Sequence, residues 1–214
     1  VTGVQTCALP ICNDTGIDAG KSLNLNGGTV QSDNDARNVA NAVNVGGDIA
    51  IGGANNLELS GNVDLGGARR QITNANATEL SGAISNGSLD LIGTGTFRLS
   101  GVNDFNDAIN VGGSVTLGAE GGSAIDDDIR LNLTDNAGFD LFGSSEEVGS
   151  LSGTANTQLD LNAMTLTVGG DDTSSEFAGQ SFGGTTDSKL TKTGTGTFTV
   201  SGDLQHGGVT AVQD

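Results

Sequence analysis

The sequence predicts an all-β solenoid, a coil of short parallel strands that repeats about every 20 residues. Three observations lead to this fold class. Apolar residues alternate with polar ones in short bursts, glycine pairs separate the bursts, and similar segments recur along the chain. Alternation indicates strands with one buried face, and recurrence at a regular interval distinguishes a solenoid from a sandwich or a barrel.

The N-terminal segment does not belong to this pattern. Residues 1–12 (VTGVQTCALPIC) resemble the translation of a sequencing-library adapter, so we exclude them from the fold. The alternative is the remnant of a signal peptide, but no basic residue precedes its short apolar run. Residues 13–214 then form one domain, which we expect to be a fragment truncated at both ends.

The composition of residues 13–214 limits the possible functions. Both cysteines (Cys7, Cys12) and the one proline (Pro10) lie in the excluded segment, which leaves no disulfide framework and no thiol-ligated metal. The net charge of −18 belongs wholly to residues 13–214 and disfavours nucleic acid and anionic membranes as partners. With 36 glycines and only 7 aromatic residues the chain could be disordered, but its periodicity argues against that.

Bursts of alternating apolar residues mark the expected strands, each roughly four to six residues long. Thr and Asn fill many positions between them, since Thr suits strands and Asn suits turns and stacks with its like. The apolar sets are Leu23/Leu25, Val43/Val45, Leu57/Leu59, Val63/Leu65, Leu89/Leu91, Ile109/Val111, Val115/Leu117, Ile129/Leu131/Leu133, Leu159/Leu161, Leu166/Val168 and Phe198/Val200.

Paired glycines lie between the bursts and predict the corners, because glycine accepts the positive φ that tight turns require. The pairs are Gly27/Gly28, Gly46/Gly47, Gly52/Gly53, Gly66/Gly67, Gly112/Gly113, Gly169/Gly170, Gly183/Gly184 and Gly207/Gly208.

Internal repeats predict the length of one coil. Residues 93–101 (GTGTFRLSG) and 194–202 (GTGTFTVSG) agree at seven of nine positions with an offset of 101. Residues 42–52 (AVNVGGDIAIG) and 108–118 (AINVGGSVTLG) agree at six of eleven with an offset of 66. A Ser-Gly pair also returns at Ser60, Ser81, Ser100, Ser152 and Ser201. These intervals lie near multiples of about 20 residues, so we expect coils of three short strands, about ten in all.

One segment has a competing pattern. In residues 35–43 the apolar Ala36, Val39, Ala40 and Val43 have helical spacing. We favour a strand there, because the matching repeat at Ala108 has no such spacing.

Residues 189–202 (KLTKTGTGTFTVSG) resemble the passenger-associated repeat of bacterial autotransporters, typically LTKTGTGTLTLSG followed by a Gly-Gly turn and another strand. Residues 88–113 are a looser second copy, and residues 165–179 (TLTVGGDDTSSEFAG) are similar to the strand and turn that commonly precede the repeat. The similarity covers nearly all of residues 21–214.

This resemblance implies a right-handed parallel β-helix on the cell surface or secreted, exported across the outer membrane of a Gram-negative bacterium. The implied partner is the passenger's own C-terminal outer-membrane β-barrel, which these 214 residues do not contain. A signal for export is expected upstream of residue 13. We expect no cofactor and no insertion of this segment into the membrane.

Two acidic clusters are candidate sites. Asp126, Asp127 and Asp128, and likewise Asp171 and Asp172, could bind calcium or act as paired acid and base. We favour solvated corners, because the iterated turn of calcium-binding repeats does not occur. The Asn-Thr-Asp, Gly-His-Gly and Arg-Ile-Lys signatures of β-helical pectin hydrolases do not occur either.

The histidine and the paired arginines have similarly plain interpretations. His206 is the one histidine, so it would have to be the general base of any serine-protease chemistry, but no Gly-Asp-Ser-Gly nucleophile loop accompanies it. Arg69 and Arg70 are expected to relieve repulsion between acids, since no phosphate-binding glycine loop with a lysine is present. We therefore predict no catalytic, cofactor-binding or metal-binding residue.

The function expected from the sequence is that of a non-catalytic surface adhesin or stalk whose host or bacterial surface ligand the sequence does not identify. Two alternatives stay open. One is a polysaccharide-degrading β-helix enzyme, and the other is a transport scaffold for an effector domain outside these residues.

Overall fold

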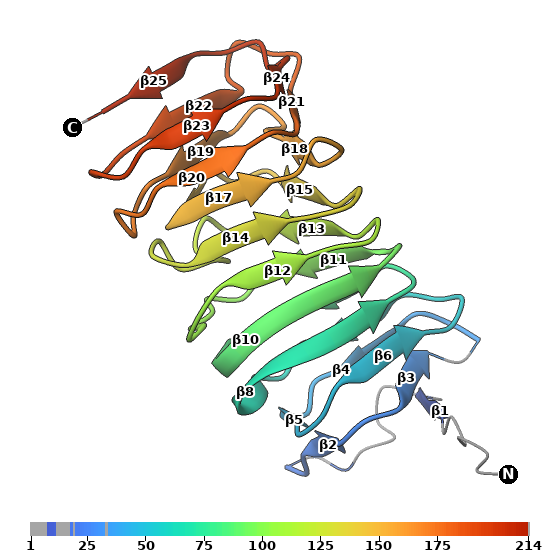
Figure 1. The fold of residues 1–214 in the computed structure, drawn as a ribbon. Coiled ribbons are helices and arrows are strands. Elements are labelled where there is room, and N and C mark those ends of the chain that lie inside the picture. The colour runs from blue at the N-terminus through green and yellow to red at the C-terminus, as the bar shows by residue number, and fades with distance from the viewer. Residues whose placement is uncertain (1–7, 12–17, 19, 33, 214) are drawn as a thin grey trace, which may run out of the picture.

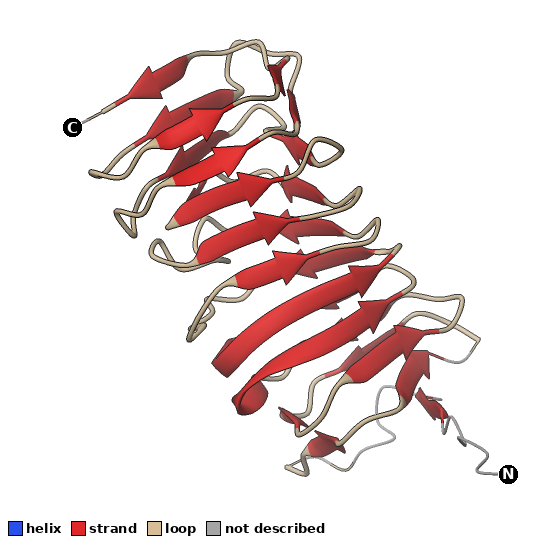
Figure 2. Cartoon of the chain, in the orientation of Figure 1, coloured by secondary structure: helices blue, strands red, loops and turns tan. Residues whose placement is uncertain are grey.

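Parallel strands stacked along one axis make up the described chain (Figures 1 and 2). The computed structural model describes residues 8–11, 18, 20–32 and 34–213. These residues form strands, turns and bends, and no helix occurs among them. The predicted all-β solenoid is therefore confirmed. Cys7 and Cys12 lie outside the described residues, and from residues 1–12 only strand β1 (Ala8–Ile11) is described, paired in parallel with β3 (Thr29–Ser32).

The strands form three sheets, which we name A, B and C. Sheet A contains β1, β3, β6 (Ile49–Gly52), β8 (Val63–Asn74), β10 (Ile84–Gly93), β12 (Ile109–Val111), β14 (Arg130–Leu133), β17 (Ser150–Gly153), β20 (Ser175–Phe177) and β23 (Phe198–Val200), with β2 (Leu23–Leu25) and β5 (Val43–Val45) beside that path. Sheet B contains β4 (Arg37–Val39), β7 (Leu57–Leu59), β9 (Thr78–Leu80), β11 (Thr96–Leu99), β13 (Thr116–Ala119), β15 (Gly138–Leu141), β18 (Gln158–Asp160), β21 (Gln180–Phe182) and β24 (Asp203–Leu204). Sheet C contains β16 (Glu146–Val148), β19 (Thr165–Val168), β22 (Lys189–Lys192) and β25 (Thr210–Val212).

Strand register measures the coil length directly. Leu23 pairs with Val43 and Val43 with Val63, which are steps of 20 residues. The step from Leu166 to Leu190 is 24 residues. The predicted length of roughly 20 residues per coil is therefore confirmed, but the described chain makes about nine coils rather than ten, because several coils are longer than 20 residues.

The winding is right-handed. In Figure 1 the near strands of sheet A run across the axis in one direction and the strands of sheet B run back behind them, while the chain advances from its N-terminus to its C-terminus. Crossover connections between parallel strands take this hand almost without exception.

The two copies of the GTGTF repeat lie in different sheets. Phe97 of the first GTGTF copy is in β11 of sheet B, whereas Phe198 of the second copy is in β23 of sheet A. In the pair of repeats offset by 66, the first strands, β5 and β12, are both in sheet A, but the second strands fall in different sheets, β6 in sheet A and β13 in sheet B. The offsets of 101 and 66 are therefore not whole numbers of coils. The unit that repeats is a strand, a corner and the next strand.

The segment with competing helical spacing is extended. Val39 and Val43 are buried, while Ala36 and Ala40 are exposed. Alternation therefore determines the conformation of residues 35–43, and Arg37–Val39 form strand β4.

Columns of apolar side chains fill the interior. The largest fully buried side chains include Phe97, Phe139 and Phe177. The apolar residues predicted to face inward are buried, except for one pair in the C-terminal coil. Phe198 and Val200 are only half-buried, because β23 is the last strand of sheet A and no described strand covers it.

Glycine has two roles in the fold. Gly66 and Gly67 have φ of +68° and +74°, as predicted for a corner, although this corner lies inside the continuous strand β8. Gly61, Gly82 and Gly101 of the Ser-Gly pairs do not need positive φ. They stack on one another, and a Cβ atom on any of them would collide with the backbone carbonyl of the coil below. Close stacking of coils therefore requires glycine there.

Candidate functional site

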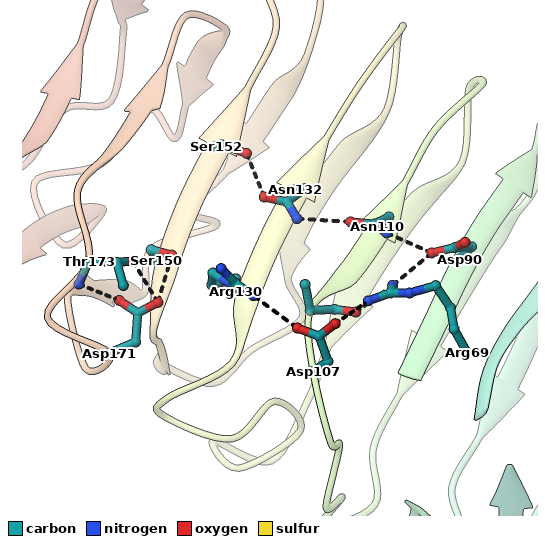
Figure 3. A network of polar contacts seen from close by, with 11 residues as sticks. Arg69, Asp90, Asp107, Asn110, Arg130, Asn132, Ser150, Ser152, Asp171 and Thr173 are labelled. Atoms are coloured by element: carbon teal, nitrogen blue, oxygen red, sulfur yellow. Dashed lines mark hydrogen bonds and ion pairs between the residues drawn. The ribbon is translucent and has the colours of Figure 1, made fainter. Parts of the chain in front are cut away.

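A ladder of polar side chains runs along the outer face of sheet A (Figure 3). The register stacks Asp90, Asn110, Asn132 and Ser152 in successive coils. Asn110 donates to Asp90 at 2.7 Å, Asn132 donates to Asn110 at 2.8 Å, and Ser152 donates to Asn132 at 2.7 Å. The side chains of this ladder therefore satisfy one another from coil to coil.

A carboxylate bridging two arginines continues the ladder toward the corner. Asp107 accepts from Arg69 at 2.7 Å and from Arg130 at 3.0 Å, and Arg69 also reaches Asp90 at 2.9 Å. The backbone N–H of Ala108, followed by Arg130, holds the pKa of Asp107 below its usual value. Arg69 thus lies between two acids, where it offsets their repulsion. Arg70 instead donates to the backbone carbonyl of Leu65.

The acidic pair Asp171 and Asp172 caps corners. Asp171 accepts from Ser150, from the Thr173 hydroxyl and from the Thr173 N–H at 2.7 to 3.0 Å (Figure 3). Asp172 accepts from the N–H and hydroxyl of Thr195 in the next coil. These bonds hold successive corners together.

A shallow notch of about 260 Å³ lies between the corners of three coils. It is lined by Asn106, Asp107, Ala108, Asp128, Ile129, Arg130, Asp171 and Thr173. Its three acids, Asp107, Asp128 and Asp171, come from different parts of the sequence, but among the described residues no three His, Cys, Asp or Glu side chains are arranged to hold a metal ion.

A longer groove of about 370 Å³ follows the outer face of sheet B across its first four strands. Its floor carries Asn38, Glu58, Glu79 and Arg98, which the register stacks one per coil. Asn38 donates to Glu58 at 2.9 Å, and Arg98 is 3.6 Å from Glu79. The groove therefore presents two stacked carboxylates, an amide and a guanidinium along the axis.

Serines of the Ser-Gly pairs brace these carboxylates. Ser81 donates to Glu58 at 2.6 Å and Ser100 donates to Glu79 at 2.7 Å. In each case the serine is one coil above the glutamate. The Ser-Gly motif therefore combines a hydroxyl that orients an acid with a glycine that allows close stacking.

An aromatic ring, outside the residues that line the groove, packs against Arg98. The Arg98 guanidinium lies 4.7 Å from the centre of the Phe142 ring, within the range of a cation–π contact. The same ring lies over Gly118, where a Cβ atom would overlap it. Asp140 follows one coil later, and burial, together with repulsion from Asp160, raises its pKa.

The one histidine contacts two hydroxyls. His206 Nδ1 lies 2.8 Å from the Ser181 Oγ and Nε2 lies 3.0 Å from the Thr210 Oγ1. Ser181 is fully buried in an inward position of sheet B, paired with Leu159 and Leu204. In the part of the chain that the structure describes, no acid bonds to the ring, and burial lowers the pKa of His206. The structure therefore brings a serine to the histidine, but in the interior of the solenoid.

A buried glutamate is the titratable group that the sequence did not indicate. Glu146 is 3% exposed, and burial raises its pKa to about 7. In the sequence it lies in a polar run (GSSEEVG) typical of a surface turn. Its spacing of two from the inward Val148 is the signal that could have placed it inside.

No protein-family model matches this chain. No curated protein and no solved structure matches it either. The resemblance to autotransporter passengers therefore depends on the residues quoted above, and the β-helix itself is the part of it that the structure establishes. Among the described residues there is no helix with the length and apolar character to cross a bilayer.

Proposed function

We propose that residues 13–214 are a non-catalytic segment of a surface-exposed autotransporter passenger that acts as an adhesin or stalk. The observation that carries this proposal is the direction of the polar contacts. Asp90, Asn110, Asn132 and Ser152 bond to one another along the axis rather than converging on one point. Such a pattern favours a stiff rod with polar flanks.

The charge of the chain supports an extracellular, water-facing rod. Arginines are few, and Arg69, Arg98 and Arg130 are all paired with acids. The remaining negative charge keeps the surface solvated and opposes self-association. Many weak polar contacts along a flank could together give adhesion by multivalency.

The adhesin part is testable on beads. Latex beads coated with residues 13–214 are expected to adhere to bacterial or epithelial cells, and beads coated with the urea-unfolded chain are not. Circular dichroism of the released protein checks that the coat was folded. Failure of folded coats to adhere to any cell or matrix would remove the adhesin and leave the stalk or scaffold.

A second candidate function is polysaccharide degradation, and the sheet B groove is the observation that favours it. Glu58 and Glu79 lie in adjacent coils on the floor of an elongated groove that could hold a polymer along the axis. Both carboxylates are already held by serines, which favours binding over proton transfer.

Incubation with pectin and related polymers separates the two functions. We expect no new reducing ends and no unsaturated products. Repeated turnover that is lost in Glu58→Gln or Glu79→Gln, and kept in Glu176→Gln on the exposed face of β20, would establish the enzyme instead.

A further inference from the structure

One stack of short strands is interrupted in the middle of the solenoid. It begins with β2 and β5 and resumes, after the interruption, with β16 and β19. Between β10 and β16 the two intervening coils carry irregular corners at residues 101–107 and 120–128, where the only bridge found among the described residues pairs Ser85 with Asp104. The N–H groups of Asp104 and Asn106 still donate to carbonyls of the coil below, but those of Phe105 and Ile125 do not have a ladder strand beside them, and buried donors without partners are costly.

Side chains replace the missing ladder, one in each coil. Asn103 accepts from the Ile84 N–H at 2.7 Å, Asp126 accepts from the Phe105 N–H at 3.0 Å, and Glu146 accepts from the Ile125 N–H at 2.8 Å. Each acceptor comes from the coil above its donor. Asn103 also donates to the Ala124 carbonyl at 2.7 Å. The corner at residues 120–128 is thus held between Asn103 below and Glu146 above.

Glu146 differs from the half-buried Asp126 because it occupies a core position, and from the equally buried Asn103 because its side chain can ionise. It pairs in register with Leu166, which pairs with Leu190, so an apolar column is stacked on it. Its Oε1 atom accepts from Ile125, while its buried Oε2 atom has no hydrogen-bond partner. A charged carboxylate with one unpaired oxygen in such a place is strongly disfavoured.

The charged groups around Glu146 increase that penalty. Asp126 and Asp127 of the corner below both raise its pKa, and Glu147 lies beside it on β16. Asp171 lies in the corner above, where its N–H donates to the Gly149 carbonyl. β19, which is stacked directly on β16, carries no charged residue. Burial is the largest cause and outweighs the N–H groups of Ile125 and Ala124, which favour the charged form.

We propose that Glu146 is a pH-responsive latch that holds the corner at residues 120–128 against β16 when its carboxyl group is neutral and releases it when the group ionises. The latch is independent of whether the rod is an adhesin or an enzyme. Its direction follows from linkage. The folded chain favours the neutral carboxyl group, so the stability that Glu146 contributes to the fold is complete below its unfolded pKa of 4.5. That stability is lost as pH rises through the folded pKa of about 7.

The test compares wild type with Glu146→Gln, which keeps the Oε1 acceptor and cannot ionise. Between pH 5.5 and 8.5 the wild-type folding constant is expected to fall on the order of 30-fold relative to that of Glu146→Gln, measured by urea denaturation. Glu176→Gln is the matched control, because it removes the same charge from an exposed position and should keep the wild-type pH dependence. Parallel pH profiles for wild type and Glu146→Gln would overturn the latch.

Two measurements on the wild-type chain locate the effect even if the variant does not fold. The Glu146 carboxyl carbon should titrate near pH 7 in an NMR series, and a midpoint near 4.5 would overturn the proposal. The Ile125 amide, corrected for its intrinsic rate, should lose hydrogen-exchange protection above pH 7. Unchanged protection of the Ile125 amide across that range would mean that ionisation of Glu146 does not release the corner, and it would overturn the latch.

Discussion

The two copies of the GTGTF motif, one in the middle of the solenoid and one at its C-terminal end, keep the same serine–glutamate hydrogen bond but differ in burial. Ser100 donates to Glu79, and Ser201 donates to Glu176 at 2.6 Å, in each case to the coil below. Phe97 is fully buried, whereas Phe198 is half-buried. The motif therefore encodes a strand and a corner, and the stacking of further coils decides how much its phenylalanine stabilises the fold.

Removal of the two phenylalanines should give the largest difference between the copies. Phe97→Ala leaves a cavity between coils and is expected to cost about 3–5 kcal/mol of unfolding free energy. Phe198→Ala should cost less than about 2 kcal/mol, because its ring is already partly exposed. Urea denaturation measures both, and equal losses would contradict the comparison.

Alanine at the corner glycine of each copy tests the stacking. A Cβ atom at Gly95 would collide with the Asn76 carbonyl, and one at Gly196 with the Thr173 carbonyl. Gly95→Ala is expected to cost about 1–3 kcal/mol, and Gly196→Ala less, because the end coil can shift. Gly184→Ala is the control, since no atom lies within 4 Å of its Cβ position, and it should change stability by less than about 0.5 kcal/mol.

The polar ladders should show a smaller difference. Asn110→Ala removes the donor to Asp90 and the acceptor of Asn132, which should cost about 1 kcal/mol in the middle of sheet A. Ser201→Ala breaks an exposed bond in the end coil and should cost only about a few tenths of a kcal/mol. If thermal denaturation ranks Ser201→Ala above Asn110→Ala, the ladder does not stabilise the central coils.

The smallest effect is expected from pH at the C-terminal end. Burial lowers the pKa of His206 from 6.5, so the folded chain favours the neutral ring. The stability that it contributes is therefore present above pH 6.5 and is lost as pH falls through the lower folded value. Hydrogen exchange of β24 and β25, corrected for intrinsic rates, should rise in acid, and His206→Gln should reduce that rise. An unchanged rise would assign it to other groups.

Strand positions, corners and coil length could be predicted from the sequence because their signals are local. Leu23 and Leu25, two positions apart, share a face in any extended strand. Gly66 and Gly67 mark a turn because of their own conformational freedom. Each of these signals lies within one strand or one turn, so it can be recognised without knowing which residues the neighbouring coil contains.

The tertiary structure alone decided which strand lies above which. The two GTGTF copies fall in different sheets because coils vary between about 19 and 24 residues, and small differences in length accumulate along the axis. Only the stacking of coils brings Ser181 to His206 and places the column of Leu166 and Leu190 over Glu146. A side chain's burial in a solenoid depends on residues some 20 positions away, and periodicity within one strand carries no record of them.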